Sequence, residues 1–165
     1  MTDPRVVSLA PSATATVAAL GAADRLVGVT NHCDLSDDAD AGSAHGIGSP
    51  TAVGGWLNPD LDRVAGLDPD VVLTSDGLQA DLADACRERG LDVAHREPST
   101  LDEAVEGFAT RGADVGRLEA GERLAADARE RLDRIADAVA DRPRPTAYCE
   151  EWSDPPMAAG NWVPD

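Results

Sequence analysis

Residues 67–90 hold the stretch that decides the fold: Leu67-Asp-Pro-Asp-Val-Val-Leu-Thr-Ser-Asp-Gly-Leu-Gln-Ala-Asp-Leu-Ala-Asp-Ala-Cys-Arg-Glu-Arg-Gly90. The run Val71–Thr74 is almost continuously apolar, which is typical of a strand buried on both faces of a sheet. A turn precedes this strand, and a helix from Gln79 to Arg89 follows it, with Gly90 as the helix stop. A buried strand that leads directly into a helix predicts a parallel sheet.

The same alternation continues on both sides of this stretch. The other predicted elements are strands at 5–10, 26–29 and 92–95, and helices at 12–20, 60–66 and 100–111. Ser12 and the pair Asn58-Pro59 are the expected starts of the first two helices, and Thr100 with Glu103 has the spacing of a capping box. Residues 30–57 show no period and are predicted to be a long loop. This order predicts an α/β fold, a Rossmann-like lobe with helices on both faces of a parallel sheet.

A long amphipathic helix is predicted from Leu118 to Val139. Its apolar residues recur at steps of four, four, three and four, which places them in one stripe: Leu124, Ala128, Leu132, Ile135 and Val139. Residues Thr146–Cys149 are then predicted to begin a new strand. A single strand is not stable alone, so the last residues resemble the start of a second domain that is truncated here.

The composition argues against two classes of function, nucleic-acid binding and direct membrane insertion. The 165 residues carry 14 basic and 31 acidic side chains, a net charge of −17, and every basic residue is Arg. Such a chain repels phosphate backbones, so nucleic-acid binding is not expected. No apolar run approaches the ~20 residues that cross a bilayer, so direct membrane insertion is not expected either. The excess of Asp and lack of Lys indicate a halophile; the alternative is an acidic protein from a GC-rich genome.

Targeting and cysteine signals are also weak. No basic segment followed by an apolar stretch opens the sequence, so the chain as written is expected to be cytoplasmic. The three cysteines, Cys33, Cys86 and Cys149, are widely spaced and support neither a disulfide framework nor a thiolate zinc site.

Ligands of open parallel sheets bind beyond the carboxyl ends of the strands, here expected at 10–12, 30–34, 74–77 and 95–98. Ser12 lies at such an end and is either a helix cap or a nucleophile. Trp56 and Trp152 fall in polar loops, where an indole offers a flat apolar face to a planar ligand or simply packs the loop. His32 is a ligand contact, an axial ligand to a bound cofactor, a metal ligand together with Cys33, Asp34 and His45, or a plain loop histidine.

Four segments together point to a family. They are Val6-Val-Ser-Leu-Ala-Pro-Ser-Ala-Thr14, Leu26-Val-Gly-Val-Thr-Asn-His-Cys-Asp34, Val53-Gly-Gly-Trp-Leu-Asn-Pro-Asp-Leu-Asp62 and Leu67-Asp-Pro-Asp-Val-Val-Leu73. Their order and spacing over about residues 5–160 resemble the cobalamin/iron-siderophore class of ABC-transporter substrate-binding proteins. The His-Cys-Asp loop, the Gly-Gly-Trp segment and Glu150-Glu-Trp-Ser-Asp-Pro-Pro156 are similar to the cobalamin subgroup.

The resemblance implies two α/β lobes joined by a rigid helix, with the ligand held in the cleft between them. It divides this chain into an N-terminal lobe (1–112), a connector helix (113–141) and the start of an incomplete second lobe (142–165). It implies solute capture for an importer rather than catalysis, with no required cofactor, cobalamin as the transported metal chelate and the ABC permease as the partner. A siderophore or haem is the alternative ligand, and family members are extracytoplasmic or on the cell surface.

The resemblance also assigns residues. Aromatic ligand contacts of relatives fall at His32, Trp56 and Ser75, of which only Trp56 is aromatic here. Ser12, Asp76 and Trp152 complete the expected ligand-binding set, and Asp62 matches an acidic residue that pairs with permease arginines. The alternative hypothesis is a small cytoplasmic α/β enzyme that uses His32, Asp34 or Glu150–Glu151 as acid and base. A third hypothesis is a subunit that is completed by pairing with another chain.

Overall fold

A five-stranded parallel sheet forms the core of the chain. The computed structural model describes residues 3–33, 49–146, 148, 150–153 and 156–158. The strands run in the order β3-β2-β1-β4-β5, and every pairing between them is parallel. Their bounds are Val6–Ser8 (β1), Leu26–Val29 (β2), Thr51–Ala52 (β3), Val71–Ser75 (β4) and Val93–Arg96 (β5). The predicted parallel α/β sheet is therefore confirmed.

The edge strand β3 lies inside the stretch that the sequence predicts to be all loop. It has only two residues, both exposed, and it pairs with Gly28 and Val29 of β2. Two exposed residues cannot produce an alternating or apolar pattern, so no local signal marks this strand. Its position is set by pairing with β2 rather than by its own sequence.

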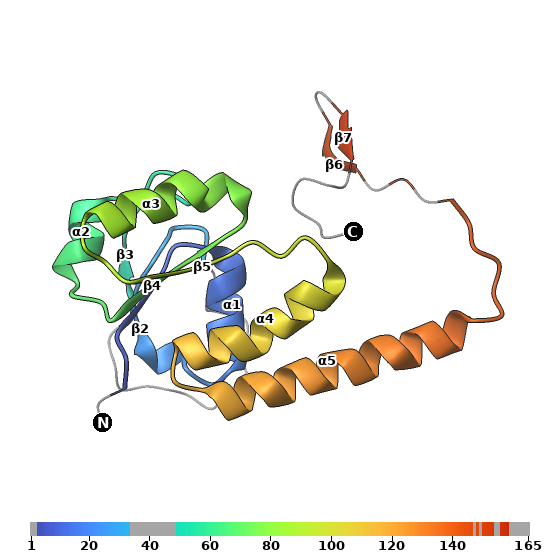
Figure 1. Ribbon diagram of the computed structural model, residues 1–165. Coiled ribbons are helices and arrows are strands. Elements are labelled where there is room, and N and C mark those ends of the chain that lie inside the picture. Colours follow the sequence, from blue (N-terminus) through green and yellow to red (C-terminus); the bar gives the residue numbers. More distant parts are fainter. Residues whose placement is uncertain (1–2, 34–48, 147, 149, 154–155, 159–165) are drawn as a thin grey trace.

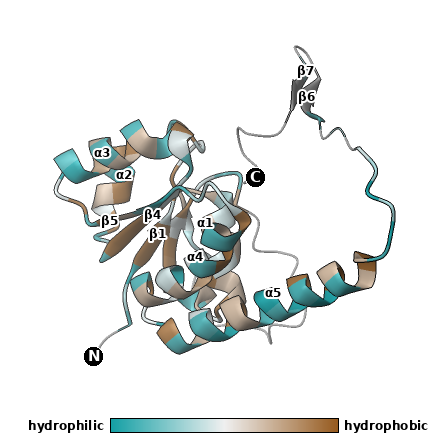
Figure 2. Ribbon diagram, turned by 45° about the vertical axis from the view of Figure 1, so that its right-hand side comes forward, coloured by the Kyte–Doolittle hydropathy of each residue, from teal (hydrophilic) through white to brown (hydrophobic). Residues whose placement is uncertain are grey.

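Helices cover both faces of the sheet (Figure 1). One apolar cluster joins α1 (Pro11–Ala19) to the sheet, and α4 (Leu101–Asp114) lies beside α1 on the same face. A second cluster joins the other face to α2 (Leu61–Gly66) and α3 (Ala80–Glu88). Neighbouring strand residues such as Val6 and Val7 belong to opposite clusters. This two-sided burial explains the continuous apolarity of β1 and β4, which Figure 2 shows as brown strands between the helices.

The starts of two helices differ from the prediction. Helix α1 follows Ala10, which makes no side-chain cap, and Ser12 lies within its first turn rather than at its N-cap. Pro11 can open the helix because the first helical N–H has no intrahelical partner. Helix α2 is capped by Asp60, whose Oδ1 accepts from the Arg63 N–H at 3.0 Å, and not by Asn58.

Other helix ends match the sequence signals. Thr100 and Glu103 form the predicted capping box of α4. Gly21 and Gly90 follow α1 and α3 with φ of +66° and +78°, a conformation that glycine adopts without strain.

Helix α5 has the predicted bounds, Leu118–Val139, but only its first half packs against the lobe. It crosses α4 where Gly121 meets the helix backbone: a Cβ there would clash with the Phe108 carbonyl oxygen and lie 2.9 Å from the Ala109 Cα. Farther along the predicted stripe, Ile135 and Val139 are 52% and 45% exposed. The helix thus leaves the sheet with apolar residues in solvent (Figures 1 and 2).

Beyond α5, residues Glu150–Ser153 (β6) and Pro156–Ala158 (β7) form an antiparallel pair outside the main sheet. Two residues of the predicted strand Thr146–Cys149, Ala147 and Cys149, lie outside the described residues; β6 begins at Glu150, which pairs with Ala158. None of the helices in the described part of the chain is sufficiently long and apolar to cross a membrane.

Replacing Gly121 with Ala should lower the free energy of unfolding by about 1–3 kcal/mol, because the added methyl group meets fixed helix backbone. Gly107→Ala, on α4, is the matched control. Nothing lies within 4 Å of a Cβ at Gly107, so this change should raise stability by about 0.4–1 kcal/mol. Urea unfolding measures both, and equal effects of the two substitutions would contradict the close helix crossing.

Candidate ligand-binding site

The carboxyl ends of the five strands share one edge of the sheet. The chain places β2 and β3 on one side of β1, then crosses over to place β4 and β5 on the other side. The order therefore reverses between β1 and β4. In open parallel sheets, ligands bind in the crevice at such a switch point.

The side-chain amide of Gln79 joins three chain segments at this point. Gln79 is fully buried. Its Nε2 donates to the carbonyl oxygens of Leu9 and Trp56 at 2.9 and 2.8 Å, and its Oε1 accepts from the Ser75 N–H at 2.9 Å. Sequence reasoning missed this residue, because a glutamine at a helix start is usually exposed. The amide brings together the ends of β1 and β4 and the loop that carries Trp56.

Trp56 lies on a short loop closed by a backbone bridge between Gly54 and Pro59. Gly54 has φ of +109°, and its carbonyl accepts from the Asn31 N–H at 2.9 Å, which ties the loop to the end of β2. Trp56 is half-buried. The loop is thus fixed on two sides, by Asn31 and by Gln79, and holds the indole near the switch point.

Ser12 lies in the exposed first turn of α1, directly after the end of β1. Its carbonyl oxygen accepts from Thr16 Oγ1 at 2.9 Å. Because the end of β1 leads directly into this turn, Ser12 follows closely on Leu9, whose carbonyl Gln79 binds. The Ser12 hydroxyl therefore belongs to the same strand edge as Trp56.

His32 is exposed in the turn after β2, and its neighbour Cys33 is held by hydroxyl groups. Thr14 Oγ1 lies 3.0 Å and Thr30 Oγ1 3.2 Å from Cys33 Sγ, and Cys33 packs against the apolar cluster under α1. The cysteine thus behaves as a small, partly buried packing residue.

Two other residues of the predicted loop cluster, Asp34 and His45, lie outside the residues that the structure describes. Neither the His32–Asp34 acid–base pair nor a loop metal site is therefore tested. Within the described residues, no group of three or more His, Cys, Asp and Glu side chains is placed to hold a metal ion.

Ser75 and Asp76 end β4 in a strained turn. Asp76 has φ of +59° and ψ of 162°, a backbone region that residues other than glycine rarely occupy. Its Oδ1 accepts from the Leu78 N–H at 2.8 Å, and its own N–H donates to Arg96 O at 2.9 Å. Burial raises the pKa of the Asp76 carboxyl above its ordinary value of 3.8, against the opposing effect of backbone hydrogen bonds from Leu78 and Gln79.

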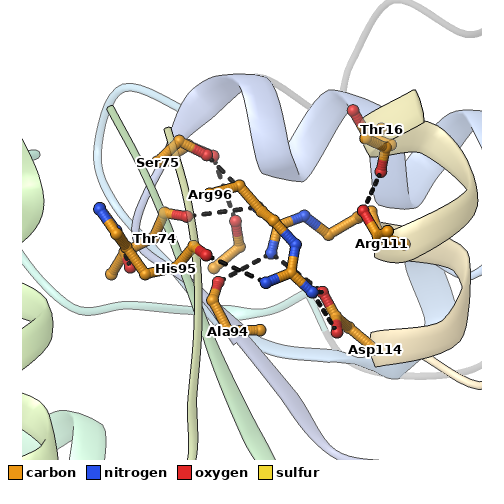
Figure 3. Close-up of polar contacts among 12 residues, drawn as sticks. Thr16, Thr74, Ser75, Ala94, His95, Arg96, Arg111 and Asp114 are labelled. Carbon is orange, nitrogen blue, oxygen red and sulfur yellow. Dashed lines mark hydrogen bonds and ion pairs between the residues drawn. The ribbon is translucent and has the colours of Figure 1, made fainter. Parts of the chain in front are cut away.

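A buried arginine lies beneath this turn (Figure 3). Arg111 of α4 donates from Nη1 to Ala94 O at 2.9 Å and from Nη2 to Thr74 O at 3.2 Å, and Nη2 lies 3.4 Å from Ser75 Oγ. Burial lowers the pKa of Arg111 to about 10, although Asp114 partly offsets the effect. The guanidinium therefore fixes the ends of β4 and β5 from the α4 side.

Arg96 and Asp114 complete this group. Arg96 Nη2 lies 2.8 and 2.9 Å from the two carboxylate oxygens of Asp114, and Arg111 Nη1 lies 3.5 Å from Asp114 Oδ2. Burial raises the pKa of Asp114 even beside these cations. Two guanidinium groups share one carboxylate, so the group leaves positive charge under Ser75.

The remaining predicted site residues are Asp62 and Trp152. Asp62 is an exposed carboxylate on α2, with 95% of its side chain accessible, and its Oδ1 lies 3.8 Å from Arg89 Nε. Trp152 is in β6, and its side chain is not among those described. A hollow of about 310 Å³ lies at the amino ends of β4 and β5, where Asp70, Val71, Asp92 and Val93 line it, and it extends to Arg96 and Asp114.

Comparison with known proteins identifies a matching family and several relatives of the chain. Residues 6–163 match the family described as "Periplasmic binding protein". A cobalamin-binding protein of Halobacterium salinarum is 33% identical over 147 residues, which are 87% of this chain and 38% of the relative. A vitamin B12-binding protein of Vibrio cholerae is 26% identical over 163 residues, 96% of this chain and 55% of the relative. The chain thus spans roughly two fifths to just over half of these curated relatives.

The fold has solved counterparts. The periplasmic vitamin B12 binding protein of Vibrio cholerae superposes with a TM-score of 0.74 at 23% identity, covering 93% of this chain and 58% of that one. Identity this low shows a shared fold. The superposition confirms the α/β fold of the chain.

Asp76→Asn should raise the free energy of unfolding at neutral pH, because Asn still accepts from the Leu78 N–H and removes a half-buried charge. The pKa of Asp76 is higher in the folded chain than its ordinary value, so folding favours the protonated carboxyl. The stability from this group is fully present below pH 3.8 and is lost as the pH rises through the folded-state pKa.

Urea unfolding across this pH window should therefore show the advantage of Asp76→Asn shrinking as the pH falls. Asp84→Asn, on the exposed face of α3, is the control for a change of net charge. An advantage that does not vary with pH would contradict the burial of the Asp76 carboxyl.

Proposed function

The chain belongs to the periplasmic binding protein family, and from this premise we propose that it is the solute-binding component of an ABC importer, with cobalamin or a related metal chelate as its ligand. Relatives named for binding cobalamin or vitamin B12 support the choice of ligand. The family captures and delivers solutes, so the site described above is proposed to bind without chemical change to the ligand.

The observation that carries the proposal is the placement of Trp56. Its loop is fixed by Asn31 and Gln79 beside the switch point between β1 and β4. A half-buried indole held in this way presents a flat apolar face at low cost in conformational entropy. The planar face of a tetrapyrrole is the ligand surface that such a platform fits.

Polar groups around the platform would orient the ligand. Ser12 lies at the end of β1, and Ser75 and Asp76 lie at the end of β4. They offer hydroxyl and carboxylate groups to the amide substituents that surround a corrin ring. The exposed imidazole of His32 is proposed as a further contact or as an axial ligand to the bound metal, and Trp152 as a contact from the far part of the chain.

The division of the chain follows from the same proposal. Residues 1–112 form one ligand-binding lobe, the helix within 113–141 is the connector, and 142–165 begin a second lobe. The exposed apolar residues Ile135 and Val139 and the greater length of the relatives support this division. A single lobe would supply only one wall of the cleft.

Titration of the purified chain with cyanocobalamin in molar salt tests the ligand. If half of a ~12 kcal/mol interaction is made by this lobe, the expected Kd is about 10–100 μM. Tryptophan fluorescence should be quenched on binding, and Trp56→Ala should weaken binding at least about 10-fold, a loss of ~1.4 kcal/mol.

Phe108→Ala is the matched control, since Phe108 is an aromatic residue on α4 at the contact with Gly121 of α5. It should leave the affinity for cyanocobalamin unchanged. Equal affinities of the wild-type and Trp56→Ala chains, or no binding at millimolar cobalamin, would contradict the proposal.

Asp62 is the proposed contact with the permease. Its carboxylate is almost fully exposed at the start of α2, where permease arginines can reach it. Asp62→Arg should reduce capture of the chain by the cognate permease in proteoliposomes about 10-fold, a loss of ~1.4 kcal/mol, because it sets like charges opposite each other. Asp84→Arg, the same charge change on α3, should have little effect, and an equal loss for both variants would refute a specific role of Asp62.

A further inference from the structure

The β1–β4 ladder is broken at the edge where the ligand is proposed to bind. The last regular rung is the Leu9 N–H donating to Leu73 O at 2.8 Å. The register pairs Ser8 with Leu73, so the next rung of a parallel ladder would be the Ser75 N–H donating to Leu9 O. Both groups instead bind the side chain of Gln79: Ser75 N–H donates to Oε1, and Nε2 donates to Leu9 O.

The Gln79 amide thus takes the place of a peptide group between the two strands. Because the side-chain amide lies between the Ser75 N–H and the Leu9 carbonyl, these two backbone groups cannot bond directly to each other. The ends of the two strands are therefore held farther apart than in a regular ladder. The second Nε2 hydrogen donates to Trp56 O at 2.8 Å, which uses the remaining donor of the side chain. One buried side chain therefore spaces β1 from β4 and positions the Trp56 loop.

The backbone around Gln79 directs its side chain inward. The Gln79 N–H donates to Asp76 O at 3.1 Å, and Asp76 Oδ1 accepts from the Leu78 N–H at 2.8 Å. These bonds form the single turn Gly77–Gln79 that follows the strained Asp76. The turn after the strained Asp76 thus returns the Gln79 side chain to the end of β4.

From this geometry we propose that Gln79 is the positioning residue of the site: it spaces the carboxyl ends of β1 and β4 and sets the orientation of the Trp56 platform. This inference deepens the proposed function, because it rests on Trp56 as the ligand platform. Gln79 itself is fully buried and acts through Trp56, Ser75 and Leu9 rather than by contact with the ligand.

The first test needs no ligand. The full chain is labelled with 5-fluorotryptophan, and the ¹⁹F signal of Trp56 is assigned by its loss in Trp56→Phe. Gln79→Met keeps the size of the side chain and removes its three hydrogen bonds, so the Trp56 signal should shift or split. Val115→Ala, in the apolar cluster on the opposite face of the sheet, is a control for a general loss of stability and should leave this signal in place.

A folded Gln79→Met chain with an unmoved Trp56 signal would overturn the inference. A second measurement on the wild-type chain covers the case in which Gln79→Met does not fold. Both Nε2 protons of Gln79 should exchange slowly with solvent, because both are donated in the interior. Fast exchange of these protons would equally overturn the inference.

Cyanocobalamin titration then separates this inference from the proposed function. If both hold, Gln79→Met weakens binding at least about 10-fold, Val115→Ala does not, and adding Gln79→Met to Trp56→Ala causes little further loss. If the Trp56 signal moves in Gln79→Met but no chain binds cobalamin, Gln79 still positions Trp56 and the proposed function fails. If the wild-type chain binds and Gln79→Met binds as well as Val115→Ala, the positioning role fails and the proposed function stands.

Discussion

A side-chain amide in the β1–β4 ladder is the interaction on which the ligand edge depends. At the point where the strand order reverses, ligands of open parallel sheets bind beyond the carboxyl ends of the two neighbouring strands. Gln79 satisfies the Leu9 carbonyl and the Ser75 N–H without letting the strands meet. The same amide holds Trp56, so the spacing of the strand ends and the apolar surface beside them are two results of one contact.

Two buried groups support this edge from opposite faces of the sheet. On the α4 side, Arg111 binds the carbonyls of Ala94 and Thr74 and reaches Ser75 Oγ, while on the α3 side the Asp76 turn carries Gln79. Farther away, the close crossing at Gly121 sets the direction in which α5 leaves the lobe. The exposed apolar residues on the outer half of α5 fit a chain that spans only part of its longer relatives.

The sequence predicts most of the helices and strands, because the signals for each lie within the element itself. The apolar runs of β1 and β4, the capping box at Thr100 and the stripe of α5 each lie within one element, and the structure confirms them. The features that the sequence does not predict depend on contacts between separate parts of the chain. Strand β3 exists through its pairing with β2, Asp60 displaces Asn58 as a cap because Pro59 is held in a bridge, and Gln79 joins residues up to 70 positions apart. Nothing in the order of residues near Gln79 signals its three partners.

Chemical-shift mapping tests the central claim most directly. The ¹⁵N-labelled chain is titrated with cyanocobalamin in molar salt, and the shifted amide and indole signals are placed on the structure. The account predicts that shifts concentrate at the Trp56 indole and at Ser12, Ser75 and Asp76, on the carboxyl edge of the sheet. Shifts centred instead on Asp70, Val71, Asp92 and Val93, at the hollow by the amino ends of the strands, would contradict it.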